Sequence, residues 1–367
     1  MAGILVHEWL AERGGSENVF EVLSETFPDA ERWCLWNDSN GRFEGVNETV
    51  LARSPLRGKK ALSVPFMPLA WRMLPERDAD WVLVSSHAFA HHARFRGPAR
   101  DVPKLVYAHT PARYVWVPEA DGRGRGLPAR ALSSALRPLD RARAQEPVAI
   151  AANSQYVADR ILNTWGREAE VIYPPVDVDR FASEPDLRER DLRILKALPD
   201  RFVLGASRFV EYKRLEEAIR VGALADIPVV LAGGGPDEAR LRAVAESSAA
   251  AVHFVSDPSQ ALLSALYRRA ALLVFAPIED FGIMPVEAMA SGTPVLVNAV
   301  GGAAESVIDG VTGAHVREWA DLSEVNVSIG RALTSAPEDC LRRAGAFGVK
   351  VFQDKISTWV AAESGVA

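Results

Sequence analysis

The chain of 367 residues is 48% hydrophobic and 25% charged, values typical of a folded globular protein with room for two domains. No apolar run is long enough to cross a membrane, and the first residues lack the basic segment and cleavage site of a secretory signal. Cys34 and Cys340 are isolated, which excludes a disulfide framework and a zinc motif and predicts a cytoplasmic protein.

Charge is distributed unevenly along the chain. The 42 Lys and Arg against 48 Asp and Glu give a net charge of −6, but residues 53–143 carry 17 basic and 7 acidic side chains. Such a segment can face an anionic lipid or a phosphorylated acceptor, although a solvated arginine-rich surface has the same composition. Peripheral contact with the inner face of a membrane is therefore one interpretation. No recognition motif accompanies the basic residues, so we expect no nucleic-acid partner.

The first half of the chain alternates apolar runs with helical patterns. A helix is expected near Ser16–Phe27, with Ser16 as its cap, and another after the capping pair Asn153–Ser154. The apolar runs end in small or polar residues, as buried parallel strands do at their carboxyl ends. These runs lie at 4–7, 81–86, 104–109 and 148–154.

A second series of the same kind follows Pro174–Pro175, a pair that neither a helix nor a central strand accommodates and that predicts a linker. Its apolar runs lie at 202–207, 227–235, 251–256, 271–277 and 293–298. Two such series predict an α/β protein with two parallel-sheet, Rossmann-like domains that face each other across a cleft. We place the domains at 1–174 and 175–340, followed by a helical tail, 341–367.

The densest group of functional residue types lies between 277 and 297. Glu279 directly follows a predicted strand, and Glu287 lies eight residues later, inside a helix that Gly282 and Pro285 allow to begin between them. The start of that helix offers amides and a positive dipole end to a phosphate. A loop acid and a surface-helix acid would have the same spacing, but the flanking Phe–Gly and Gly–Thr–Pro–Val residues favour a binding site.

A pair of cations follows the first strand of the second domain. Arg208 and Lys213 lie five residues apart, so a loop can turn both toward a diphosphate and stabilise the charge of a nucleotide leaving group. No acidic metal motif lies beside a strand end, so we expect these cations in place of a magnesium ion and assign no metal site.

Three features of the first domain are weaker candidates. Gly14–Gly15 allows close approach to a phosphate, and His109, at a strand end near Tyr114 and Trp116, can bond a sugar hydroxyl or carry a proton. His7 and Glu8 end the first strand and either line the cleft or seal it. We take the remaining histidines of this domain as structural or surface residues without acids nearby; they are His87, His91 and His92.

These stretches together resemble the family 4 glycosyltransferases of the GT-B fold, over nearly the whole chain. More narrowly, they are similar to the bacterial branch of mannosyl- and polysaccharide-type transferases. The motifs that carry the resemblance are HEWLAERGGSENV (7–19), HTPARYVW (109–116), ANSQYVADRI (152–161), SRFVEYKR (207–214) and PIEDFGIMPVEAMASGTPVLVN (277–298).

The resemblance implies a retaining, metal-independent transfer of a sugar from a nucleoside-diphosphate sugar, with GDP-mannose favoured. The acceptor would be a hydroxyl of a lipid-linked, saccharide or small-molecule compound, bound by the first domain, and the second domain would hold the donor. The final helix would cross back onto the first domain, in agreement with apolar anchors at Phe352 and Trp359. No cofactor is implied, because the nucleotide-sugar is a substrate.

The resemblance also assigns roles to residues. Glu279 would contact hydroxyls of the transferred sugar near His109, and Glu287 would contact the ribose. The diphosphate would lie among Arg208, Lys213, Gly14, Gly15 and the amides of Phe281, Gly282 and Ile283. The base would lie near Val255 and Ser256, which stand in a loop position that usually carries a glycine.

Four alternatives can be named, and three of them belong to another class of protein. A GT-B sugar-nucleotide epimerase would bind the same donor and transfer nothing, and a transferase of this kind could instead use a UDP- or dTDP-sugar for a natural-product acceptor. A binding protein without activity would be expected to lack some of Arg208, Lys213, Glu279 and Glu287, which are all present. A dinucleotide oxidoreductase is disfavoured because Glu238 stands where the third glycine of its fingerprint belongs.

Overall fold

The computed structural model describes residues 2–117 and 127–365. The chain forms two compact units, which are described separately. Unit 1 comprises residues 1–175 together with 350–367, and unit 2 comprises residues 176–349. No helix in the described part of the chain has both the length and the apolar content needed to span a membrane.

The strands of unit 1 form a parallel sheet in the order β5-β3-β1-β6-β7-β8-β9. Their bounds are β1 Gly3–His7, β3 Glu31–Cys34, β5 Val46–Glu48, β6 Trp81–Ser86, β7 Lys104–Ala108, β8 Ala149–Ala152 and β9 Glu170–Val171. A second, small sheet pairs β2 (Leu10–Ala11) with β4 (Asn37–Asp38). The central strands β1, β6 and β7 are almost wholly buried, which explains their near-continuous apolar sequences.

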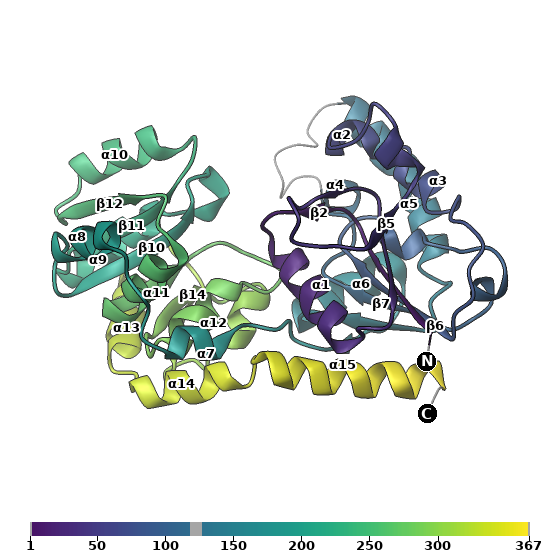
Figure 1. Ribbon diagram of the computed structural model, residues 1–367. Helices are drawn as coiled ribbons and strands as arrows, with labels where there is room; N and C mark the ends of the chain where they lie inside the picture. Colours follow the sequence, from purple (N-terminus) through teal and green to yellow (C-terminus); the bar gives the residue numbers. More distant parts are fainter. Residues whose placement is uncertain (1, 118–126, 366–367) are drawn as a thin grey trace. The chain divides into compact units, whose positions relative to one another are not determined.

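Helices cover both faces of this sheet (Figure 1). They are α1 Gly15–Thr26, α2 Lys60–Ser63, α3 Met67–Ala70, α4 Arg113–Trp116, α5 Leu127–Arg143, α6 Gln155–Trp165 and α15 Val349–Ser364, with short 3-10 turns η1 Val50–Arg53, η2 Ala90–His92 and η3 Pro98–Arg100. Alternate strand residues enter two separate cores, since Val84 belongs to one and Leu83 to the other.

The last helix completes one of these cores. Phe352, Ile356, Trp359 and Val360 of α15 pack with Phe20 of α1 and with strand residues on the same face of the sheet. The ring of Phe352 lies edge-on to Tyr107, with centroids 5.6 Å apart. The predicted return of the C-terminal helix to the first domain is therefore confirmed, and α15 (yellow) runs beside α1 in Figure 1.

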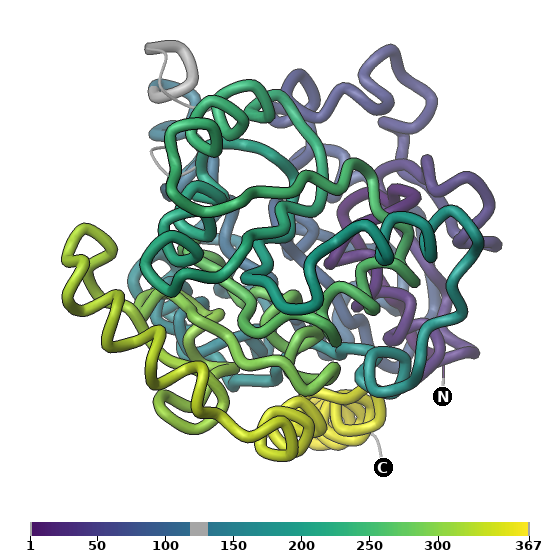
Figure 2. Tube along the Cα trace, turned by 90° about the vertical axis from the view of Figure 1, so that its left-hand side faces the viewer, coloured from purple at the N-terminus to yellow at the C-terminus, as the bar shows by residue number. Residues whose placement is uncertain are grey.

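The strands of unit 2 also form a parallel sheet, in the order β12-β11-β10-β13-β14-β15. Their bounds are β10 Phe202–Arg208, β11 Val229–Gly234, β12 Val252–Ser256, β13 Ala270–Phe275, β14 Val295–Asn298 and β15 Gly313–Val316. Helices surround this sheet (Figure 1, and turned by 90° in Figure 2). They are α7 Val178–Ala182, α8 Glu189–Lys196, α9 Glu216–Ala225, α10 Glu238–Glu246, α11 Gln260–Arg269, α12 Ile283–Ala290, α13 Leu322–Leu333 and α14 Pro337–Gly345, with 3-10 turns η4 Glu211–Lys213 and η5 Gly302–Ser306.

The predicted fold class of two parallel-sheet, Rossmann-like units is confirmed. Ser154 caps α6 as expected, because its hydroxyl accepts a hydrogen bond from the Val157 amide at 3.0 Å. The predicted cap of α1 is wrong, since the helix begins at Gly15 and the hydroxyl of Ser16 donates to Glu17 at 2.8 Å. The carboxylate of Glu17, one residue further into the first turn, removes the need for a serine cap at this helix start.

Candidate active site

The candidate residues of unit 2 lie at the carboxyl ends of two neighbouring strands. β10 ends at Arg208, and the turn η4 that follows it ends at Lys213. Glu279 stands four residues beyond the end of the adjacent strand, β13. Because open α/β sheets bind their ligands at this edge, the two loops occupy the position that the sequence predicted for a donor site.

Lys213 and Glu279 form a direct ion pair across these loops. Their side chains are 13% and 22% exposed, so water screens the pair only in part. The sequence predicted separate roles for the two residues and did not predict their contact. Each charge therefore has a partner in the protein. A ligand that binds Lys213 in place of Glu279 must also supply a hydrogen-bond donor to the Glu279 carboxylate.

The backbone of Glu279 is held by a glycine loop after β14. The Gly302 amide donates to the Glu279 carbonyl oxygen at 2.8 Å. Gly301 has a φ of +110°, and a β-carbon there would lie 3.0 Å from the same oxygen. Glycine is thus required for the approach that fixes Glu279.

Arg208 is exposed, and its guanidinium donates to the hydroxyl of Tyr212 at 3.2 Å. The two predicted diphosphate ligands therefore have different surroundings, since Lys213 is paired with a carboxylate and Arg208 is solvated beside a phenol. An exposed arginine of this kind can move toward a ligand at little cost.

The helix α12 begins where the sequence predicted a phosphate-binding helix start. Gly282 precedes it with a φ of +83°, and a β-carbon there would lie 2.9 Å from the β-carbon of Ala303. Phe281 is buried and packs on Phe347, with ring centroids 5.6 Å apart. Ile283 is the first helical residue, and no side chain caps the helix. The first amides of a helix have no partner within it, so this end can accept an anion.

Glu287 lies on the next turn of α12 and is half-buried. The hydroxyl of Tyr267 donates to its Oε2 atom at 3.0 Å. Burial raises the pKa of Glu287 to about 7, against the opposing effect of this hydrogen bond. Glu287 is therefore about half-protonated near neutral pH. It gains its full capacity to accept hydrogen bonds only at a pH above its pKa. Nothing in the sequence around Tyr267 indicated its part in the site.

Val255 and Ser256 do not form a loop, as the sequence suggested, but end the strand β12. Val255 is buried and Ser256 is exposed. The sheet register pairs Ser256 with Gly233 and Gly233 with Ser207, so Ser256 lies two strands, or about 10 Å, from the end of β10. The alternating pattern of VHFVS continues to Ser256, and for that reason the strand includes both residues.

In unit 1, His7, Ser85 and His109 meet at the carboxyl ends of the adjacent strands β1, β6 and β7. The Ser85 hydroxyl lies 3.0 Å from Nδ1 of His7 and 2.8 Å from Nε2 of His109. All three side chains are buried. His7 also stacks on Phe20, with centroids 4.9 Å apart. The structure thus joins His109 to His7 through a serine that the sequence analysis did not single out, although the run WVLVSS ends with it.

The glycine pair of the first domain lies at the start of α1, as predicted. Gly14 precedes the helix and Gly15 is its first residue. A β-carbon at Gly14 would lie 2.0 Å from a carboxylate oxygen of Glu17, so the acid fills the space that the glycine leaves. A phosphate at this helix start would therefore meet a carboxylate as well as amides.

Glu8 seals the core and does not line a site. Its Oε1 atom accepts hydrogen bonds from the amides of Ala88, at 3.0 Å, and Ala90, which hold the turn η2 in place. Burial raises the pKa of Glu8 to about 8, although these amides favour its charged form. Glu8 is consequently a neutral carboxylic acid over most of the physiological pH range.

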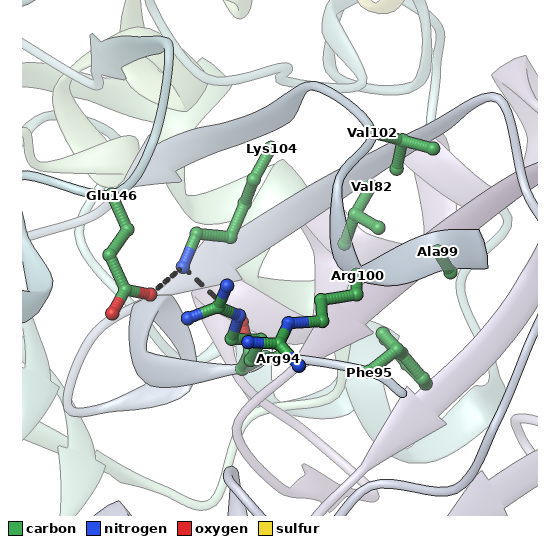
Figure 3. A pocket seen from close by; sticks show the side chains of 9 residues that line it. Val82, Arg94, Phe95, Ala99, Arg100, Val102, Lys104 and Glu146 are labelled. Atoms are coloured by element: carbon green, nitrogen blue, oxygen red, sulfur yellow. Dashed lines mark hydrogen bonds and ion pairs between the residues drawn. The ribbon is translucent and has the colours of Figure 1, made fainter. Parts of the chain in front are cut away.

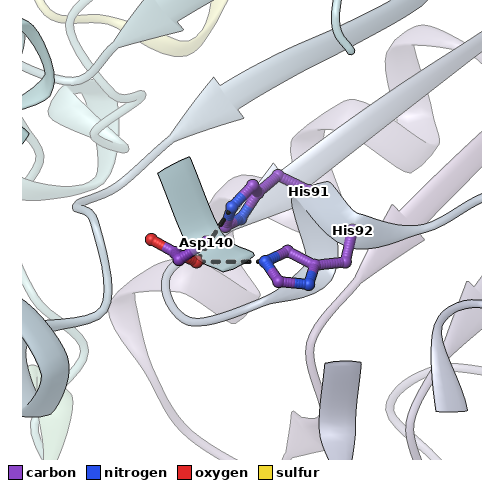
Figure 4. A group of neighbouring side chains, drawn as sticks. All are labelled: His91, His92 and Asp140. Atoms are coloured by element: carbon purple, nitrogen blue, oxygen red, sulfur yellow. Dashed lines mark hydrogen bonds and ion pairs between the residues drawn. The ribbon is translucent and has the colours of Figure 1, made fainter. Parts of the chain in front are cut away.

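The expectation that His91 and His92 have no acid nearby is wrong. Both lie against Asp140 of α5, with Nε2 atoms 3.1 and 3.0 Å from its Oδ1 atom (Figure 4). The indoles of Trp116 and Trp165 donate to Oδ2 at 2.7 and 2.8 Å. The acid comes from a helix about fifty residues away in the chain, so local spacing gave no sign of it.

These contacts make the Asp140 group a structural core. Burial opposes the charge of Asp140, but His91 and His92 outweigh burial, so its pKa lies below the ordinary value. Asp140 accepts hydrogen bonds from His92, Trp116 and Trp165, and Nε2 of His91 lies 3.1 Å from it, so a metal ion at this trio would have to replace these contacts. The same network holds Trp116 between Asp140 and the guanidinium groups of Arg137 and Arg141. Tyr114 is half-buried beside Phe89.

A cavity of about 220 Å³ lies elsewhere in unit 1 (Figure 3). Its lining includes Val82 and Lys104, near the starts of β6 and β7, and therefore the opposite edge of the sheet from His109. Lys104 is held there by Glu146 at 2.9 Å. This cavity is not part of the candidate active site.

Comparison with known proteins agrees with this arrangement. Residues 8–180 match the family model described as "Glycosyltransferase Family 4", and residues 188–339 match "Glycosyl transferases group 1". The chain belongs to the family 4 glycosyltransferases of the GT-B fold. Each of the two units thus corresponds to one family model.

Among curated relatives, the chain is 32% identical over 227 residues to a GDP-mannose-dependent α-(1-6)-phosphatidylinositol monomannoside mannosyltransferase of Mycolicibacterium smegmatis. It is 31% identical over 245 residues to a D-inositol 3-phosphate glycosyltransferase of Mycobacterium bovis. The matches cover 56% and 61% of this chain but only 57% and 49% of the relatives, so they span about half the length of each.

Solved structures show the same fold at lower identity. Anabaena HepE in complex with UDP aligns with a TM-score of 0.69 and 20% identity, over 98% of this chain and 100% of that one. WaaG, a glycosyltransferase involved in lipopolysaccharide biosynthesis, aligns with a TM-score of 0.67 and 16% identity, over 98% and 99% of the two chains. The likeness supports the GT-B fold.

The buried acid Glu8 makes a pH-dependent contribution to stability. Its pKa is 4.5 in the unfolded chain and about 8 in the folded protein, so stability is lost as pH rises from about 4.5 to about 8. We expect Glu8→Gln to gain stability relative to the wild type over this range, by up to about 1.4 kcal/mol per pH unit. Thermal or denaturant unfolding of both proteins at several pH values measures this difference. The exposed Glu25→Gln on α1 is the control, and parallel pH curves for wild type and Glu8→Gln would contradict the assignment.

Proposed function

We propose that this chain is a retaining, metal-independent glycosyltransferase whose unit 2 binds a nucleoside-diphosphate sugar. The observation that carries the proposal is the Lys213–Glu279 ion pair, which lies at the carboxyl edge of the sheet one turn before the uncapped start of α12. A cation, a carboxylate and free helix amides in one loop region match the diphosphate and the sugar hydroxyls of such a donor.

Donor binding would exchange partners at this ion pair. The diphosphate would take Lys213 and the exposed Arg208, and the first amides of α12 would bond its oxygens. Glu279, released from Lys213, would accept hydrogen bonds from hydroxyls of the sugar. Glu287, one turn further along α12, would accept from the ribose. The net change in buried charge is small, because Lys213 and Glu279 each exchange their protein partner for a group of the donor.

The chemical step follows from the charges that the donor places there. The acceptor hydroxyl oxygen attacks the anomeric carbon as the bond from that carbon to the β-phosphate oxygen breaks. The hydroxyl proton passes to an oxygen of the leaving diphosphate on the same face of the sugar, so the products are a glycoside and the nucleoside diphosphate. Arg208 and Lys213 stabilise the charge that develops on the leaving group, in the role that a metal ion has in other transferases.

Mannose is the favoured sugar and GDP the favoured nucleotide. The support is the GDP-mannose-dependent mannosyltransferase from Mycolicibacterium smegmatis, whose name also gives a phosphatidylinositol mannoside as acceptor. The complexes of Anabaena HepE with UDP and with UDP-glucose make UDP-sugars the second choice. A hydroxyl of a lipid-linked saccharide is the acceptor class that we propose.

Substitution of the ion pair tests the donor site. We expect Lys213→Ala to weaken GDP-mannose binding about 10- to 100-fold, since a charge-assisted hydrogen bond contributes about 1.5–3 kcal/mol. Calorimetry or a thermal-shift titration with GDP-, UDP-, dTDP- and ADP-sugars gives the affinity and identifies the base. The control is Arg242→Ala, a surface cation of unit 2 that pairs with Glu238 and stacks on Phe254.

Three results would contradict the proposal. Undiminished donor affinity in the Lys213→Ala, Arg208→Ala double variant would remove the diphosphate assignment. Conversion of the donor sugar into an isomer, in a reaction without acceptor, would show an epimerase. Added EDTA should leave the rate of sugar transfer unchanged. Loss of transfer in the presence of EDTA would refute metal independence.

The raised pKa of Glu287 predicts that donor affinity depends on pH. Because ribose hydroxyls donate to the charged carboxylate, binding should strengthen as pH rises from about 6 to about 8, through the pKa of about 7. Glu287→Gln should remove most of this dependence. Titrations of GDP-mannose at several pH values measure it, with the exposed Glu246→Gln as control. An unchanged pH dependence in Glu287→Gln would exclude this residue as its source.

We also propose that unit 1 contacts an anionic membrane through the surface of α2 and α3. Leu62, Phe66, Leu69 and Met73 are 62%, 48%, 60% and 53% exposed, and they lie within twelve residues of the chain, on two short helices and the turns that follow them. We call these four residues the apolar ridge. The exposed cations Arg53 and Lys59 lie in the same segment. Apolar side chains beside cations are suited to the interface of an anionic bilayer.

The basic stretch of residues 53–143 contributes less charge to this surface than its sequence suggests. Five of its cations are ion-paired with three acids from outside the stretch, and each acid offsets one positive charge in the folded protein. These cations are Arg57, Arg72, Arg77, Lys104 and Arg143, and their partners are Asp38, Glu31 and Glu146. Residues 118–126 of the stretch lie outside the described residues. The apolar ridge therefore supports membrane contact better than the charge count does.

Loss of the apolar ridge should weaken membrane binding. We expect the double substitution Leu62→Ala, Leu69→Ala to lower partitioning onto vesicles of phosphatidylcholine and phosphatidylglycerol at least about tenfold. Two leucines that become partly buried in the bilayer interface contribute roughly 1.5 kcal/mol or more to binding. Co-sedimentation with the vesicles measures this effect. The control removes two exposed apolar residues of α13, Leu322→Ala with Val327→Ala. Equal sedimentation of the ridge variant and the wild type would refute the contact.

A further inference from the structure

The cavity near the starts of β6 and β7 is lined by both charged and apolar side chains (Figure 3). Its charged residues are Arg94, Arg100, Lys104 and Glu146, and its apolar residues are Val82, Ala93, Phe95, Ala99 and Val102. Three of the four charged residues are cations. The charge of the cavity therefore depends on which of these cations have an acid as partner.

Glu146 is already shared by several cations. Arg72 donates to both of its carboxylate oxygens, at 2.5 and 3.0 Å. Lys104 contacts Oε2 at 2.9 Å, and Arg143 contacts Oε1 at 2.9 Å. One negative charge thus faces three positive charges, so this group keeps an excess of two positive charges. Glu146 cannot offset the charge of a further arginine as well.

The ammonium group of Lys104 has no hydrogen left for a ligand. Its Nζ atom donates to the carbonyl oxygens of His91, at 3.0 Å, and Ala93, at 3.3 Å, in addition to Glu146. An ammonium group has three hydrogens, and these three acceptors use them all. Burial lowers the pKa of Lys104 to about 8 despite Glu146, and nearby arginines add to the effect. Lys104 therefore contributes positive charge to the cavity and no free donor.

Arg94 and Arg100 are the lining residues that have donors to offer. Arg94 is half-buried, and its guanidinium has no hydrogen bond or ion pair within the part of the chain that the structure describes. Arg100 lies 4.0 Å from Asp101, whose side chain is 83% exposed, so water screens this contact. In Figure 3 both guanidinium groups point into the same part of the cavity as the Lys104 ammonium. Cations that share a cavity in this way repel one another unless an anion lies between them.

Backbone hydrogen bonds hold the segments that carry the two arginines. The Arg94 amide donates to the carbonyl oxygen of Trp71 at 3.0 Å. The Ala99 amide, one residue before Arg100, donates to the carbonyl oxygen of Arg77 at 2.9 Å. The backbone around the cavity is thus ordered without a ligand, which lowers the entropy that a ligand loses for the protein on binding.

We propose that this cavity binds the phosphate group of a small phosphorylated compound, with Arg94 and Arg100 as its ligands. A guanidinium group presents paired N–H donors that fit two oxygens of a phosphate. A phosphate monoester carries roughly −1.5 to −2 charges near neutral pH, enough for both arginines. The apolar side chains would contact a short carbon skeleton.

The size and place of the cavity separate this site from the proposed donor site. Its volume of about 220 Å³ is below the roughly 300–1,000 Å³ of sites for drug-sized ligands, so a nucleotide-sugar does not fit. It lies at the edge of the unit 1 sheet opposite to His109. The phosphate can belong to a soluble compound or to a lipid headgroup, because glycerol 3-phosphate and phosphatidic acid carry the same phosphomonoester.

Calorimetric titration of the full chain with glycerol 3-phosphate, at constant ionic strength, tests the soluble source. We expect saturable binding to the wild type, and Arg94→Gln should weaken it at least about tenfold through loss of charge-assisted hydrogen bonds. Arg100→Gln should act in the same direction. The matched control is Arg96→Gln, which removes the same charge from an exposed arginine of the same segment that does not line the cavity.

Two further measurements assign the effect to this cavity. The proposed donor site also carries cations, so the titration is repeated with Lys213→Ala, which should keep the affinity of the wild type. Binding lost in Lys213→Ala and retained in Arg94→Gln would overturn the proposal. Without ligand, Arg94→Gln should unfold at a temperature no lower than the wild type, because its guanidinium has no acid partner to lose among the described residues. A much lower unfolding temperature would assign Arg94 to the fold and overturn its role as a ligand.

Co-sedimentation with phosphatidylcholine vesicles that contain phosphatidic acid tests the lipid source. If glycerol 3-phosphate does not bind but Arg94→Gln lowers the capture of the protein by these vesicles, and Arg96→Gln does not, the phosphate is that of a lipid headgroup. Vesicles of phosphatidylcholine alone give the baseline. Equal behaviour of Arg94→Gln and Arg96→Gln toward both probes would overturn the proposal.

Discussion

A parallel sheet brings the carboxyl ends of all its strands to one edge, and the candidate chemistry of both units depends on this constraint. Residues that are far apart in the chain become neighbours there because their strands are adjacent. Lys213 meets Glu279 since β10 lies beside β13, and His7 meets His109 through Ser85 since β6 lies between β1 and β7. Hydrogen-bonded strands lie about 4.8 Å apart, a distance that matches the reach of side chains from neighbouring loops.

Burial divides the ionisable groups of these units into two kinds. Asp140 accepts hydrogen bonds from His92, Trp116 and Trp165 and stays charged, so it can hold α5, η2 and α6 together. Glu8 and Glu287 receive fewer donors, and burial raises the pKa of each toward neutrality. The number of donors around a buried carboxylate therefore determines whether it acts as a fixed structural charge or as a group that responds to pH and ligands.

The sequence predicted the features that depend on local pattern. Apolar runs that end in small or polar residues located the strands of both sheets, and Gly282 with Pro285 located the start of α12. Short strands such as β3 and β15 were missed, because four residues of mixed polarity carry too little periodic signal.

Contacts between distant segments could not be predicted in this way. Asp140 was not connected with His91 because no local rule relates a helix to a turn fifty residues earlier. The pairing of Lys213 with Glu279 depends on strand order, which a single sequence does not specify. The Ser85 bridge depends on strand order in the same way, because β6 must lie between β1 and β7 before Ser85 can meet both His7 and His109.

The position of α15 links the folding of unit 1 to the order in which the chain is synthesised. Phe352, Ile356, Trp359 and Val360 fill a core whose other members lie within the first 172 residues. A nascent chain must therefore complete all of unit 2 before the ribosome supplies the helix that covers this face of unit 1. Until then, the apolar side chains of α1 and of the sheet on that face stay open to water or to chaperones. The first unit to emerge from the ribosome is thus the last to be finished.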